Sequence, residues 1–76
     1  MSGGAFMVWG WHLPYEVELT RFLKPEELAQ MQEWLADGQN GTAGGYAFTE
    51  QGGLPARTIF CFADHNTAFY FKFRWA

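Results

Sequence analysis

The chain has 76 residues, 20% of them aromatic, and a formal net charge of −3. This length suits one domain spanning residues 1–76, and the negative charge repels phosphate backbones, which makes nucleic acid an unlikely partner. A single cysteine, Cys61, excludes an internal disulfide framework and a multi-cysteine zinc site. No run approaches the roughly 20 apolar residues of a membrane span. We therefore expect a soluble, cytoplasmic domain without a membrane span.

Charge is unevenly distributed along the chain. Residues 1–38 carry six carboxylates against two cations, giving −4, whereas residues 39–76 carry two carboxylates against three cations, giving +1. Charged residues make up only 17% of the chain, below the roughly 25% usual for soluble domains. More of the surface is therefore left to apolar groups, which favours self-association or a partner protein.

Residues 1–14 form an aromatic N-terminal arm. One interpretation is that residues 6–9 add an edge strand whose aromatic side chains are buried under a helix. The other is that Trp9 and Trp11 stay partly exposed as interface anchors, because Trp and Tyr dominate binding hot spots. Trp9 and Trp11 have the same parity, so they project from one face of an extended arm. Together with Tyr15, they are the candidate anchors for a partner.

The first clear strand is predicted over residues 15–20, where apolar and polar side chains alternate with a period of two. A helix follows over residues 25–37. Pro25 suits its first position, and an apolar stripe recurs at i, i+3 and i+7. Gly38 is expected to close this helix as a left-handed cap.

The predicted helix carries four acidic residues, which are either a solvated face or an electrostatic lure for a basic partner. These candidate partner-binding residues are Glu26, Glu27, Glu33 and Asp37.

Beyond the helix, residues 39–45 contain three glycines and are expected to be a flexible loop. A short strand is predicted over residues 46–50 and a turn over residues 51–56, which contain Gly52, Gly53 and Pro55. Residues 57–63 form the third strand, which is apolar on both faces and therefore central in the sheet.

The tail over residues 64–75 fits two local structures. With a period of two, it is a strand that alternates aromatic residues with others, and aromatic strand propensity favours this. As a helix, it is capped by Asp64, stacks Ala68, Phe71 and Trp75 at i, i+3 and i+7, and has cations in its last turn.

The segment IFCFADHNTAFYFKFRW resembles the end of many short phage-encoded proteins of unknown function. These finish with a strand, an acidic turn and a helix of the type A-x-x-F-K-x-R-W. The matching positions are Phe60, Phe62, Asp64, Ala68, Phe71, Lys72, Arg74 and Trp75. The resemblance implies a β-α-β-β-α order, similar to a ferredoxin-like fold that lacks its last strand. On this ground we expect a helix over residues 64–75.

No combination of residues forms a catalytic signature. Cys61 lies between two phenylalanines of a predicted strand, so a buried core thiol explains it better than a nucleophile. His12 and His65 are the only imidazoles, and no ligand spacing brings them together with Asp64 or Glu16 into a metal site. The glycines fit no phosphate-binding pattern. We expect neither a cofactor nor an enzyme.

These observations predict an α+β two-layer domain, with an antiparallel sheet of three or four strands and helices on one face. The leading functional hypothesis is a non-catalytic, phage-encoded interaction protein that binds and modulates a host protein. The alternative is a self-assembling structural subunit of a phage or cellular complex, in which the arm or a sheet edge pairs with another copy. A small enzyme or ligand sensor is a third, less favoured class.

Overall fold

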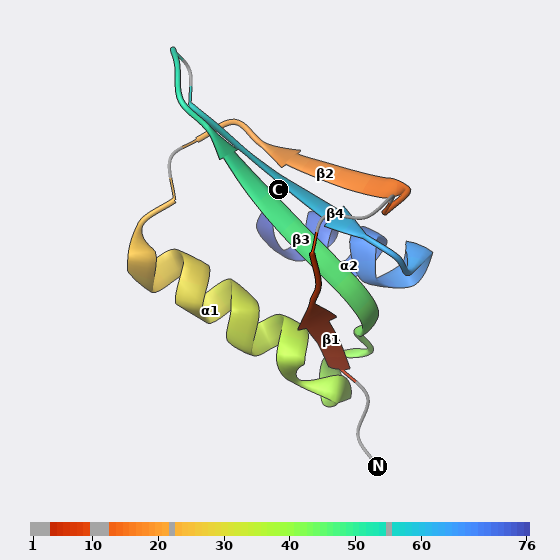
Figure 1. Ribbon diagram of the computed structural model, residues 1–76. Helices are drawn as coiled ribbons and strands as arrows, with labels where there is room; N and C mark the ends of the chain where they lie inside the picture. The colour runs from red at the N-terminus through yellow and green to blue at the C-terminus, as the bar shows by residue number, and fades with distance from the viewer. Residues whose placement is uncertain (1–3, 10–12, 22, 55) are drawn as a thin grey trace.

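A computed structural model describes residues 4–9, 13–21, 23–54 and 56–76. Within these residues the chain forms two layers, a mixed sheet and a pair of α-helices (Figure 1). The elements in chain order are β1 Gly4–Met7, β2 Tyr15–Leu19, α1 Pro25–Ala36, the 3-10 helix η1 Gly38–Asn40, β3 Ala43–Gln51, β4 Arg57–Phe62 and α2 His65–Trp75. The predicted α+β class is confirmed, with four strands in the sheet and both α-helices packed on it.

The sheet has the order β1-β3-β4-β2. β4 pairs antiparallel with β2 and with β3, so β2 and β3 run parallel to each other with β4 between them. A β-α-β unit split by a third strand is the core of the ferredoxin-like arrangement, which confirms that part of the prediction. β1 lies on the edge of the sheet opposite β2.

β1 pairs parallel with β3, so the sheet is mixed, and the expectation of a purely antiparallel sheet is wrong for this strand. At two glycines the backbone of β1 or β3 comes close to a neighbouring segment, and these contacts determine where β1 lies. A side chain at Gly4, which has φ +112°, would meet the Ala36 carbonyl at the end of α1, and a side chain at Gly45 would meet Val8. Glycine at both positions lets β1 lie against α1 and β3 at once.

The core forms where both helices pack on one face of the sheet. Phe71 of α2 lies 4.6 Å from Phe60 and 5.1 Å from Phe62, measured between ring centroids. Trp34 of α1 lies 6.3 Å from Phe71. Phe60, Phe62 and Phe71 have no exposed surface. Because Phe60 and Phe62 alternate with Cys61, they project from the same side of β4, and none of the described helices packs on the other side.

The end of α1 differs from the prediction. Gly38 is not its left-handed cap: Asp37 ends the helix with an extended backbone and accepts a hydrogen bond from the Gln39 N–H, which starts η1. The left-handed residue is Gly41, with φ 80°. The buried Thr42 hydroxyl then donates to the Leu35 carbonyl at 2.7 Å, satisfying an acceptor at the helix end.

Residues 43–45, predicted as part of the flexible loop 39–45, belong to β3, which therefore begins three residues before the predicted strand 46–50. Two long-range contacts explain this extension. β1 pairs with this part of β3, and the Thr67 hydroxyl accepts the Ala43 N–H at 2.9 Å. Local sequence favours a loop here, and tertiary pairing overrides it.

The tail is helical, as the resemblance implied, and the strand alternative is wrong. The Asp64 carboxylate accepts the Thr67 N–H at 2.8 Å, which caps the helix as expected. Lys72 and Arg74 occupy the last turn, where cations oppose the negative end of the helix dipole.

We expect Phe71→Ala to lower the free energy of unfolding by about 3–5 kcal/mol, because it empties the centre of the core. Phe73→Ala removes a phenyl ring as well, but from a side chain that is 85% exposed. We expect this variant to change the free energy of unfolding by less than about 0.5 kcal/mol. Urea unfolding followed by circular dichroism compares the two variants. Equal losses would contradict the assignment of Phe71 as the core contact.

Candidate functional site

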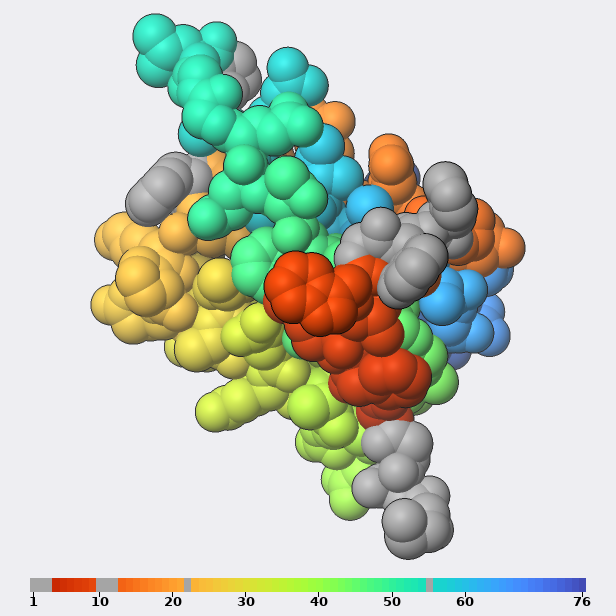
Figure 2. Space-filling view, in the orientation of Figure 1, coloured from red at the N-terminus to blue at the C-terminus, as the bar shows by residue number. Residues whose placement is uncertain are grey.

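The N-terminal arm exposes large apolar side chains. Phe6 is 58% exposed, Met7 50% and Trp9 88%. Figure 2 shows the segment in red on the surface, beside the green of β3. The edge strand of the arm spans residues 4–7 and not the predicted 6–9, and its aromatic side chains are not buried under a helix. α1 approaches β1 at Gly4, next to the buried Ala5, and the bulky side chains stay outside.

A hollow lies beside the arm. It is lined by Met7, Val8 and Trp9 together with Ala47, Phe48 and Thr49 of β3. The Val8 N–H donates to the Tyr46 carbonyl at 2.9 Å, and the paired register of β1 ends one residue earlier. From Ala47 onward, β3 has no strand partner on this edge among the described residues. Apolar side chains and an open strand edge therefore meet at one place.

The other predicted anchors are not gathered here. Tyr15 lies on β2, at the opposite edge of the sheet from β1, where its ring meets His65 edge-on with centroids 5.3 Å apart. Trp11 and His12 lie outside the described residues. Of the predicted aromatic set, Trp9 alone is placed on the arm surface.

Three of the four acidic candidates share one side of α1. Glu26, Glu33 and Asp37 are spaced by seven and four residues and are exposed. At the end of this row, Glu33 and Asp37 line a hollow with Arg74 and Trp75 of α2. The Arg74 guanidinium lies 4.2 Å from the centre of the Trp75 ring, so this end of the acidic row faces a cation.

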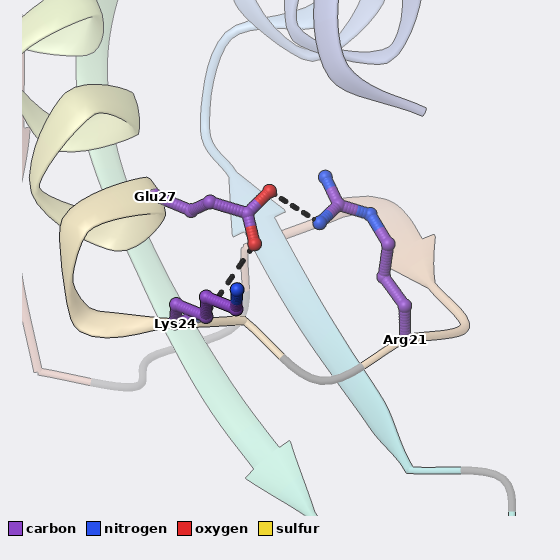
Figure 3. A network of polar contacts seen from close by, with 3 residues as sticks. All are labelled: Arg21, Lys24 and Glu27. Atoms are coloured by element: carbon purple, nitrogen blue, oxygen red, sulfur yellow. Dashed lines mark hydrogen bonds and ion pairs between the residues drawn. The ribbon is translucent and has the colours of Figure 1, made fainter.

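Glu27 is engaged in a local network of polar contacts (Figure 3). Its carboxylate accepts hydrogen bonds from the Arg21 guanidinium and from the backbone N–H of Lys24. The bond from Arg21, followed by that from Lys24, lowers the pKa of Glu27. Glu27 therefore caps α1 and is a poor candidate for partner contact.

A second exposed aromatic surface lies on α2 and was not among the predicted site residues. Phe69 is 59% exposed and Phe73 85%, and their rings stack with centroids 6.5 Å apart. The sequence analysis stacked Ala68, Phe71 and Trp75 on one side of this helix and assigned no role to Phe69 and Phe73. Their spacing from Phe71 is the signal that could have found this surface, because positions two residues away on a helix point away from its buried side.

The reactive residue types give little chemistry. Cys61 is partly buried on the face of the sheet without helices, and burial, with a smaller effect from the charge of Glu16, raises the pKa of its thiol. Within the described residues, no group of three or more His, Cys, Asp or Glu side chains is placed to hold a metal ion. The described helices include none long and apolar enough to cross a membrane.

Comparison of the chain with protein-family models, with curated proteins and with solved structures finds no match.

The raised pKa of Cys61 predicts slow alkylation, since a smaller fraction of the thiol is ionised at a given pH. We expect Glu16→Gln to increase the rate with iodoacetamide at pH 8 by roughly twofold, because it removes the carboxylate charge that raises this pKa. Glu18→Gln removes the next carboxylate on the same face and serves as the control. A rate unchanged by Glu16→Gln would contradict the electrostatic contribution.

Proposed function

We propose that this protein is a non-catalytic interaction protein, phage-encoded, that binds and modulates a host protein through its N-terminal arm. The observation that carries the proposal is the exposure of Trp9, with Phe6 and Met7 beside it. An exposed tryptophan next to an apolar hollow matches the chemistry of binding hot spots.

The cost of keeping such side chains in water supports this proposal. Burial of an aromatic side chain contributes roughly 1.5–3 kcal/mol, and a domain this small has little stability to spare. Because Phe6 and Trp9 are largely exposed, they contribute little of this burial free energy to the stability of the fold. A partner that covers them would recover it, which supports binding as the role of these side chains.

We expect Trp9→Ala, alone or with Trp11→Ala, to abolish capture of the partner while leaving the unfolding midpoint unchanged, because Trp9 is 88% exposed. Tagged protein is used to capture partners from host lysate, and the recovered protein is quantified by mass spectrometry. Leu54→Ala is the matched control, since Leu54 is an equally exposed apolar residue at the far end of the β3–β4 hairpin. Undiminished capture by the Trp9 variants would refute the arm as the binding site.

A self-assembling subunit is the second candidate, and the unpaired edge of β3 beside the arm is the observation that favours it. Analytical ultracentrifugation of the pure protein separates the two. Concentration-dependent association that Trp9→Ala removes would favour the subunit. A monomer over the whole concentration range would refute the subunit and leave the modulator proposal.

A further inference from the structure

A different surface of the molecule is formed by the outer edge of β2. β2 is the last strand in the order β1-β3-β4-β2, and no described strand pairs with its outer edge (Figure 1). In the full ferredoxin-like order β-α-β-β-α-β, one more strand follows the second helix. The split β-α-β unit here leaves β2 as the strand with a free edge beside α2, so an incoming strand has backbone donors and acceptors to pair with.

The helix side of β2 carries an exposed aromatic side chain at this edge. Tyr15 alternates onto the same face of β2 as Val17 and Leu19 and is 38% exposed. Its ring meets His65, at the start of α2, edge-on with centroids 5.3 Å apart. In a two-layer domain, a strand added to β2 would turn alternate side chains toward Tyr15 and His65.

The opposite face of β2 is acidic. Glu16 and Glu18 alternate with Val17 and point to the side of the sheet that has no helix. Glu18 makes an exposed ion pair with Arg57 at 3.5 Å, whereas Glu16 makes none with any described residue. Side chains directly across a strand pair interact, so an added strand would be favoured by cations on this face.

We propose that the β2 edge binds one extended segment of a partner protein in which basic residues alternate with apolar ones. Its basic side chains lie beside Glu16 and Glu18, and its apolar side chains pack toward Tyr15. This site is independent of the N-terminal arm, because β1 and β2 lie at opposite edges of the sheet. The proposal does not depend on the proposed function.

A second copy of the chain fits the edge poorly. Antiparallel pairing of β2 with β2 about a two-fold axis would place Glu16 and Glu18 of one copy across from the same residues of the other. Like charges directly opposite each other are destabilising, so the same carboxylates that favour a basic strand disfavour this dimer.

The test uses a short capped peptide in which lysine and valine alternate, with amide chemical shifts and fluorescence anisotropy as readouts. We expect binding that perturbs the amides of residues 15–19 and of His65. A peptide of the same composition with its lysines grouped at one end should bind at least about tenfold more weakly, because it cannot present alternating faces. Shifts confined to residues 6–9, or equal binding of both peptides, would overturn the proposal.

Charge reversal makes the test specific for the edge. The double variant Glu16→Lys with Glu18→Lys is expected to weaken binding of the lysine-valine peptide about tenfold or more. It should gain binding of a glutamate-valine alternating peptide. Glu26→Lys with Glu33→Lys makes the same change in net charge on α1 and should change affinity by no more than about twofold. If both double variants lost affinity for the peptide to the same extent, the cause would be long-range charge, and a site at β2 would be refuted.

Further variants separate this site from the arm. Tyr15→Ala removes the exposed ring on the helix side of β2 and should weaken binding of the lysine-valine peptide about fivefold. Trp9→Ala and Phe69→Ala, at exposed side chains away from this edge, should leave peptide binding unchanged. Loss of binding in Trp9→Ala with none in Tyr15→Ala would overturn the assignment of the site to β2, while leaving the arm proposal standing.

Discussion

The contact of Phe71 with Phe60 and Phe62 is the constraint on which the other packing depends. It fixes α2 to the central strand β4, with ring centroids 4.6 and 5.1 Å apart. Trp34 then packs on Phe71 and brings α1 onto the same face of the sheet. A domain of 76 residues has one core, so an aromatic cluster shared by the sheet and both helices must supply much of its stability.

The limited size of this core also explains why other aromatic side chains are exposed. The tail places aromatic side chains at several neighbouring positions of α2, but a helix offers only one side to a sheet. Phe71 takes that side, and Phe69 and Phe73 must face outward. β1 behaves similarly: the close approach to α1 admits only Gly4 and Ala5, so the larger side chains that follow remain on the surface. Local geometry thus places both groups of aromatic side chains on the surface.

Local patterns predicted β2, α1 and β4 well, because each follows a clear period of two or 3.6 residues. The helix at 65–75 was ambiguous by period, and the resemblance decided it correctly. β1 pairing and the early start of β3 were not predictable in the same way. Both depend on contact between residues 4–7 and 43–46, and no local pattern reports a contact between such distant segments. The grouping of Tyr15 with Trp9 failed for the same reason, since composition does not reveal which sheet edge a residue occupies.

The parallel pairing of β1 with β3 also has a consequence for synthesis. Gly4 leaves the ribosome well before Ala43, with which it pairs. At about 5–20 residues per second, several seconds pass before the partner strand exists. During that interval Phe6, Met7 and Trp9 have no sheet to join, so the nascent chain presents its apolar arm to other proteins before the domain is complete.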